Sequence, residues 1–358
     1  MAGKGLKGME FKTHVYYMRD GKPVSEYLER GAKVIRDGGT VVFPTETVYG
    51  LGADALSETA IAKIFKAKGR PSDNPLIVHI SSLDMLVYLI KEPISEKTKI
   101  LIDKFWPGPL TMIFKKSDNV PYGVTAGLDT VAVRMPDHPI AFDLIKMSGR
   151  PIAAPSANIS GKPSPTRGNH VVSDMIGKVD VIYCGDDSKV GLESTVLDLS
   201  GEIPVILRPG AVTLEQLEEV IGEVRIDKGI LQEKGTPKAP GMKYAHYAPD
   251  APMYIVKGST EKAAKKINEL ALLSESEGKK VGILAASTNG HLYNSDVVIG
   301  FGETNNLEEI GANIFHALRE LDRMKLDIIY AEAVDEKGIG MAIMNRLKKA
   351  AANRIIEV

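Results

Sequence analysis

The chain has 358 residues, of which 44% are hydrophobic and 25% charged, a composition typical of a globular protein of about two domains. Its 45 Lys and Arg balance 46 Asp and Glu, and the net charge of −1 excludes a globally basic nucleic-acid-binding protein, so any RNA contact would be weak or use a local patch. The one cysteine, Cys184, excludes a disulfide framework, a zinc ribbon and a cysteine-bound iron–sulfur cluster, and it indicates a reducing compartment.

The chain begins MAGKGLKGMEFK, which lacks the apolar stretch of a signal peptide. No later segment reaches the roughly 18 uncharged apolar residues that a membrane-spanning helix requires. We therefore expect a cytoplasmic protein without membrane contact.

The first part of the chain mixes the periodicities of helices and strands. Helices are predicted at 24–39, 58–68, 82–91, 95–105, 138–148, 168–177 and 213–222. Strands are predicted at 40–43, 75–80, 110–115, 130–135, 151–155, 180–184, 194–199 and 204–208, with a loop over 44–55. Several strands follow one another directly, which predicts a twisted mixed sheet with helices around it.

A second α/β pattern follows a change of composition near residue 227. Residues 235–252 hold four prolines and two glycines without a regular period, as in an ordered linker. Beyond it, strands are predicted at 253–257, 280–285, 296–300 and 327–332, and helices at 260–275, 305–324 and 340–354. The expected organisation is a first domain over 1–226, a linker over 227–251, and a smaller Rossmann-like α/β domain over 252–358.

Common motifs of nucleotide and metal chemistry are missing. There is no GxxxxGK[ST] loop, and the GxG fragments at 300–302 and 338–340 do not complete GxGxxG, so turns explain them. The seven histidines are scattered without an HExxH pair, which gives no sign of a metal site built from protein ligands. A GxSxG elbow is also absent, and this disfavours an α/β-hydrolase.

Five loops at predicted strand ends carry hydroxyl, amide and cationic side chains. They cover residues 43–52, 66–75, 153–166, 193–195 and 207–210. Each has a plain structural reading, such as hydroxyls that bond to their own turn or lysines that complement a helix terminus. Five such loops in one domain favour a ligand cavity at one rim of the sheet.

Together these loops resemble the YrdC-type family, and within it the two-domain L-threonylcarbamoyladenylate synthases. FPTETVYGLG, KxRP with NPL, WPGPLT, VAVRMP, APSAN, ESTV and RPG occur in that order over about residues 25–222. The KxR…SxN signature of the family stands here as Lys68, Arg70, Ser156 and Asn158. PGMKYAHYAP and the second α/β pattern are similar to the long form of the family.

The resemblance implies an enzyme that makes threonylcarbamoyl-AMP and pyrophosphate from ATP, bicarbonate and L-threonine, with Mg²⁺ bound to ATP. A separate complex would then transfer the threonylcarbamoyl group to tRNA next to the anticodon. The resemblance assigns catalysis to Lys68 and Arg70. It assigns L-threonine binding to Thr47, His79, Arg134, Ala154 and Ser194, and ATP binding to Arg70, Asn74, Thr130, Ser156, Asn158, Ser164 and Arg208.

The linker suggests a further role. Tyr244, His246 and Tyr247 are unusual in a passive tether, and we expect them to close over the cavity as a lid that retains the unstable carbamate. The plainer reading is a linker packed on the surface by its aromatic rings. For the whole protein, the alternative function is an RNA-binding or ribosome-maturation factor that uses the same basic cavity.

Overall fold

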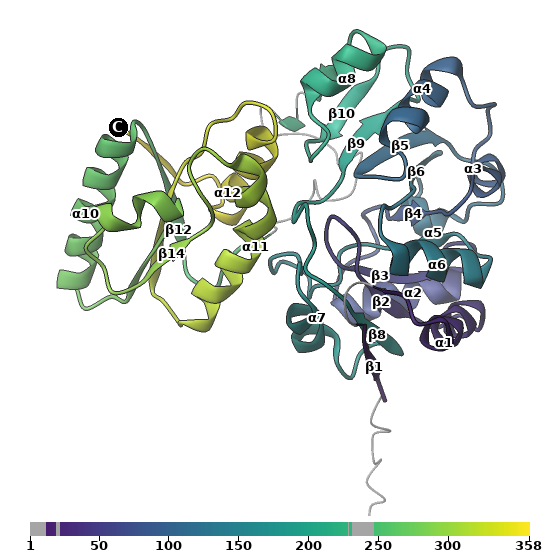
Figure 1. The fold of residues 1–358 in the computed structure, drawn as a ribbon, viewed down its shortest axis with the longest axis horizontal. Coiled ribbons are helices and arrows are strands. Elements are labelled where there is room, and N and C mark those ends of the chain that lie inside the picture. The colour runs from purple at the N-terminus through teal and green to yellow at the C-terminus, as the bar shows by residue number, and fades with distance from the viewer. Residues whose placement is uncertain (1–11, 19–21, 228, 231–246) are drawn as a thin grey trace, which may run out of the picture.

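The computed structural model describes residues 12–18, 22–227, 229–230 and 247–358. Within them the chain forms two α/β units that lie side by side, the first coloured purple to teal and the second green to yellow in Figure 1. No helix among the described residues is long and apolar enough to cross a membrane.

The first unit is built on a mixed sheet. Its described strands are β1 (His14–Tyr17), β2 (Val41–Phe43), β3 (Gly50–Asp54), β4 (Ile77–His79), β5 (Leu110–Lys115), β6 (Thr130–Arg134), β7 (Ile152–Ala153), β8 (Val181–Cys184), β9 (Thr195–Asp198), β10 (Val205–Arg208) and β11 (Arg225–Ile226). They lie in the order β1-β8-β2-β3-β7-β4-β6-β5-β9-β10-β11. The sheet contains parallel pairs such as β4–β6 and antiparallel pairs such as β5–β6, so the predicted mixed sheet is confirmed.

Helices cover this sheet, and all but a short one over 122–125 lie at the predicted positions. They are α1 (Ser25–Arg36), α2 (Glu58–Lys68), α3 (Leu83–Leu89), α4 (Glu96–Phe105), α5 (Tyr122–Thr125), α6 (Pro139–Ser148), α7 (Gly168–Met175) and α8 (Leu214–Ile221). Ser57, Ser82, Ser95 and Thr213 each cap a helix by accepting a backbone N–H with the side chain. Such caps satisfy donors that the first turn leaves unpaired.

The predicted loop over 44–55 is wrong in its second half, because residues Gly50–Asp54 form strand β3. Two glycines and an alanine obscured the strand, since these residues have low β propensity. Packing requires a glycine at position 52, because a Cβ at Gly52 would lie 2.5 Å from Ile152 and 2.6 Å from Phe43. Pairing with β2 and β7 therefore decides the conformation here.

The second unit is a parallel sheet with helices. Its strands are β12 (Met253–Lys257), β13 (Val281–Ala285), β14 (Val298–Gly300), β15 (Ile328–Glu332) and β16 (Ile355–Glu357), in the order β14-β13-β15-β12-β16. Its helices are α10 (Thr260–Ser276), η2 (Ser287–Leu292), α11 (Leu307–Arg323) and α12 (Gly340–Ala350). All pairs described in this sheet are parallel, which confirms the Rossmann-like prediction. The helix predicted over 340–354 ends earlier, because the chain turns there into β16.

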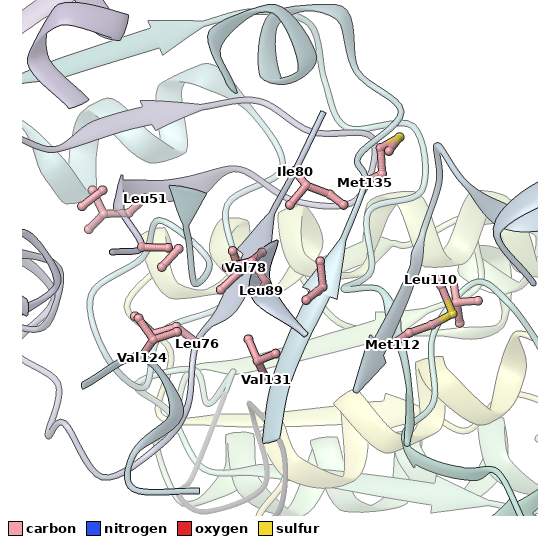
Figure 2. Packing of buried hydrophobic residues seen from close by; sticks show 14 of the residues in the cluster. Leu51, Leu76, Val78, Ile80, Leu89, Leu110, Met112, Val124, Val131 and Met135 are labelled. Atoms are coloured by element: carbon pink, nitrogen blue, oxygen red, sulfur yellow. The ribbon is translucent and has the colours of Figure 1, made fainter. Parts of the chain in front are cut away.

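The core of the first unit lies between its sheet and its helices. Figure 2 shows Val78, Val131 and Met112, from the neighbouring strands β4, β6 and β5, in the same apolar cluster as Leu76 and Val124. All five side chains are buried. Such burial stabilises the fold by roughly 25 cal/mol per Å² of apolar surface, and it fixes the strands whose ends carry polar residues.

The two units also share an apolar cluster. Val48, Leu192 and Tyr247 pack with residues of the second unit, whose helices α11 and α12 face the first unit in Figure 1. At Gly191, which has a φ of +69°, a Cβ would lie 2.5 Å from the carbonyl oxygen of Ala312 on α11. The backbones of the two units therefore meet with no room for a side chain.

Candidate active site

A cavity lies where several strand ends of the first unit meet. His79 ends β4 and Arg134 ends β6, and the two are register partners in this parallel pair. Both side chains line the cavity. The complete lining is Thr45, Thr47, Val48, Tyr49, Gly50, Arg70, Pro75, Leu76, Ile77, His79, Arg134, Ala154, Pro155, Ser156, Asn158, Glu193, Ser194, Arg208 and Tyr247.

Arg134 is held in a fixed orientation by buried partners. Its guanidinium donates to Thr47 Oγ1 at 2.8 Å and to the Gly108 carbonyl at 3.2 Å. A third contact is an ion pair with Glu46, with 2.6 Å between the charged atoms. Because rotamers fixed in this way lose little entropy on binding, Arg134 is a preorganised site for an anionic group.

His79 lies beside Arg134 and is also buried. Burial, together with the nearby Arg134 charge, lowers the pKa of His79 to about 3. The imidazole is therefore neutral near pH 7. In the described part of the chain its Nδ1 has no hydrogen-bond partner, so the ring retains an unused polar atom.

Ser194 and Arg208 form a second polar group in the cavity wall. Arg208 donates to the Ser194 carbonyl at 2.8 Å and to Ser194 Oγ at 3.1 Å. Thr111 lies 2.7 Å from the same hydroxyl. Burial is the main reason that the pKa of Arg208 is lowered to about 10, and the group remains cationic near pH 7.

Lys68 does not line the cavity, but its side chain contacts a loop that does. Its ammonium is buried and donates to the Ser156 carbonyl, to the Asn158 carbonyl at 2.6 Å and to Asn158 Oδ1 at 3.3 Å. Burial, and then the charge of Arg70, lower the pKa of Lys68. In this arrangement the lysine fixes the loop that presents Ser156 and Asn158.

The cavity thus gathers three arginines, one neutral histidine and several hydroxyls. Arg70, Arg134 and Arg208 come from segments far apart in the chain. Such a set suits a ligand with more than one anionic group, because guanidinium binds carboxylate and phosphate oxygens in pairs. Among the described residues, no group of three His, Cys, Asp or Glu could hold a metal ion.

Comparison with known proteins follows the same division of the chain. The family model Sua5_yciO_yrdC, described as telomere recombination, matches residues 33–210. A model described as threonylcarbamoyl-AMP synthase, C-terminal domain, matches residues 212–352. A threonylcarbamoyl-AMP synthase of Pyrococcus abyssi is 54% identical over 91% of this chain and 94% of its own. The chain belongs to the Sua5/YrdC family.

Other members of the family are similar to this chain over nearly its whole length. A threonylcarbamoyl-AMP synthase of Bacillus subtilis is 49% identical over 92% of this chain and 94% of its own. A crystal structure of Pyrococcus abyssi Sua5 complexed with L-threonine superposes with a TM-score of 0.91 at 51% identity. It covers 96% of this chain and 99% of that one, so the likeness extends over both units.

Most of the residues predicted from the family resemblance lie together. Those that line the cavity are Thr47, His79, Arg134, Ala154 and Ser194 from the L-threonine set, and Arg70, Ser156, Asn158 and Arg208 from the ATP set. What each of them binds stays a prediction.

Four predicted residues lie outside the lining. Lys68 contacts the loop of Ser156 and Asn158 on the side away from the cavity lining. Asn74 is buried, with its carbonyl accepting from Arg70 at 3.2 Å. Ser164 is buried and donates to Glu193 at 2.6 Å. Thr130 begins β6, at the opposite end of the strand from Arg134.

The predicted lid is described only at its end. Tyr244 and His246 lie outside the described residues. Tyr247 is buried, lines the cavity and packs on Phe315 of α11, with 5.0 Å between ring centres. This tyrosine therefore connects the linker, the cavity and the second unit, while the lid as a whole stays a prediction.

Three charged residues of the site, Glu46, Glu193 and Arg346, were not predicted from the sequence. Glu46 pairs with Arg134, and Glu193 pairs with Arg346 of α12 at 2.8 Å. Glu46 and Glu193 stand inside the motif loops, and a carboxylate among the hydroxyl residues of these loops was the available signal. Arg346 had none, because it lies in a helix with Lys348 and Lys349 and nothing in the local sequence separates it from them.

Proposed function

We propose that this chain joins L-threonine, bicarbonate and ATP into threonylcarbamoyl-AMP with release of pyrophosphate, acting as a nucleotidyltransferase. The observation that carries the proposal is the convergence of Arg70, Arg134 and Arg208 on one cavity. The reaction requires such a set, because both the amino acid and the nucleotide bring negative charge to the same place.

L-threonine would occupy the half of the cavity around Arg134. Its carboxylate would accept from the Arg134 guanidinium, which Thr47 and Glu46 keep in position. Ser194 offers a hydroxyl for the polar groups of the amino acid. A neutral His79 can accept a hydrogen bond there without adding charge.

ATP would occupy the half around Arg70, Ser156, Asn158 and Arg208. The cationic groups would neutralise the phosphates, and Mg²⁺ would enter bound to them, with few ligands from the protein. Lys68 would contribute indirectly, because it fixes the loop whose Ser156 and Asn158 face the phosphates.

The chemistry has two steps. The threonine amine first adds to bicarbonate, with loss of water, and forms a carbamate. A carbamate oxygen then attacks the α-phosphorus of ATP, the bond to the bridging oxygen breaks, and pyrophosphate leaves. Positioning and electrostatic stabilisation would supply most of the rate, as in other transfers at phosphorus. The adenylate would pass to a separate complex that modifies tRNA.

The alternative, an RNA-binding factor that uses the same cavity, is not favoured. Arg134 and Arg208 are only 3% and 6% exposed, so their charges are turned inward. A phosphate backbone binds to exposed lysines and arginines. Buried guanidinium groups suit a small ligand that enters the cavity.

The test is pyrophosphate release by the purified chain with ATP, Mg²⁺, bicarbonate and L-threonine. We expect release that requires both bicarbonate and L-threonine, and mass spectrometry should find threonylcarbamoyl-AMP. L-valine is the control, because it keeps the shape of threonine and lacks the hydroxyl. Release without dependence on threonine, or none from a folded sample that binds ATP, would overturn the proposal.

A further inference from the structure

Arg346 is a charged residue of the second unit whose contacts reach the cavity wall of the first. It lies on α12 and is fully buried, with a relative exposure of 0%. Its Nε donates to Glu193 Oε2 at 2.8 Å, and another guanidinium nitrogen donates to the Pro209 carbonyl at 3.0 Å. Glu193 and Pro209 both belong to the first unit.

Each of these contacts reaches a loop that lines the cavity. Glu193 lines it directly and precedes Ser194, while Pro209 follows Arg208. The other carboxylate oxygen of Glu193 accepts from Ser164 at 2.6 Å. One arginine from the second unit therefore joins the loop of Ser194 to the loop of Arg208.

Charge gives Arg346 a second effect on the cavity. Burial alone would raise the pKa of Glu193, but Arg346 and then Arg208 lower it to about 2, so this carboxylate is ionised. An ionised carboxylate in the wall of a cavity repels an anionic ligand. Arg346 cancels that charge from the side away from the ligand, because it is not itself a lining residue.

We propose that Arg346 is a positioning residue for the reaction: it neutralises Glu193 and holds the two loops that carry Ser194 and Arg208, so that the cavity accepts ATP. The inference rests on the proposed function. It gives the second unit a direct part in substrate binding, through one ion pair across the boundary between the units.

The experiment compares Arg346→Met, Arg346→Lys, Glu193→Gln and the double variant Arg346→Met/Glu193→Gln in the full-length chain. Pyrophosphate release is followed against ATP concentration at saturating L-threonine and bicarbonate. Arg346→Met removes the strongest counter-charge of the carboxylate, and we expect it to raise the KM for ATP about tenfold with a smaller change in kcat. Arg346→Lys keeps the charge and should recover most of the loss.

The double variant separates charge from packing. The neutral amide that Glu193→Gln introduces cannot repel ATP, so the proposal requires the double variant to recover at least about half of the tenfold loss in affinity. Failure to recover would show that neutralisation of Glu193 does not contribute to ATP binding, and it would overturn the proposal. A wild-type KM for ATP in Arg346→Met would do the same.

Asp174→Asn is the matched control. It removes the charge from another ion pair between the units, the largely buried Asp174 with the partly buried Arg319 at 2.7 Å, whose carboxylate is not in the cavity wall. We expect a KM for ATP within about twofold of wild type. An equal rise in both variants would mean that general docking of the units sets the affinity, and the inference would fail.

Two further measurements keep the result interpretable. If Arg346→Met does not fold, as thermal unfolding would show, the double variant, which has no orphaned carboxylate, is compared with Glu193→Gln: the proposal requires a KM for ATP close to that of Glu193→Gln, and a tenfold rise would overturn it. Calorimetric titration with ATP and Mg²⁺ measures affinity without turnover. If wild type binds ATP and releases no pyrophosphate, the proposed function fails, while the order of ATP affinities among the variants still tests Arg346.

Discussion

Arg134 and Glu46 form an ion pair of 2.6 Å next to the cavity, and both side chains are less than a tenth exposed. Of the two, only Arg134 lines the cavity. Glu46 therefore orients the arginine from behind and leaves its outer face for a ligand. A buried charge without its partner is destabilising by about 3–5 kcal/mol, so each residue depends on the other.

Substitution Arg134→Met should raise the KM for L-threonine about ten- to hundredfold, because a charge-assisted hydrogen bond contributes roughly 1.5–3 kcal/mol. The measurement is pyrophosphate release against threonine concentration at saturating ATP. The double variant Glu46→Gln/Arg134→Met removes the orphaned carboxylate, so it should recover stability and leave KM high. An unchanged KM in Arg134→Met would place the threonine carboxylate elsewhere.

Substitution Lys68→Met should destabilise the fold and weaken ATP binding together. The loop carbonyls of Ser156 and Asn158 lose their buried donor, at a cost of about 1–3 kcal/mol for each. Chemical denaturation and ATP titration measure the two effects. Lys66→Met, an exposed lysine on the same helix, is the control and should change stability by less than about 0.5 kcal/mol. Lost turnover with normal stability and ATP affinity would instead make Lys68 a direct catalyst.

Substitution Gly210→Ala should impair the cavity through the backbone. A Cβ at this position would lie 2.6 Å from the Glu193 carbonyl oxygen and would also press on the Thr195 amide nitrogen. We expect the strand start around Ser194 to shift, and kcat/KM to fall by more than about tenfold. Gly201→Ala, where the nearest atom would be 3.9 Å away, is the comparison and should behave as wild type. Equal activities would show that the loop adapts without cost.

His79 should make the protein sensitive to acid. Its folded pKa of about 3 lies below the ordinary value of 6.5, because burial and Arg134 disfavour the charged ring. The unfolded chain then binds the extra proton, so stability is lost as the pH falls from 6.5 towards 3. Between about pH 7.5 and 5.0, wild type should lose about 2 kcal/mol more unfolding free energy than His79→Gln.

Urea denaturation at the two pH values measures this difference. His291→Gln removes an exposed histidine and controls for the loss of a ring as such. Parallel pH profiles for wild type and His79→Gln would contradict a neutral, buried imidazole.

Much of this molecule was predictable from the sequence because the relevant signals are local. The helix over 58–68 follows from Ser57 and from apolar spacing, and α2 has those bounds. The loops with Ser156 and Arg208 were recognisable because polar residues directly follow apolar strand segments, and the loop with Arg70 because cationic residues lie between a helix and a strand. The resemblance to a family added their common location, and the cavity brings them together.

Only the tertiary structure decided which charges face the cavity and which support it. Lys68 stands in the same motif as Arg70, yet its ammonium turns to the backbone of a loop about 90 positions away. Glu193 pairs with Arg346 across 153 positions and between two units. Local composition sets helices, strands and turns, whereas the partner of a buried charge depends on how distant segments pack. Because a buried ion needs a close counter-charge, that packing also determines which groups remain for the ligand.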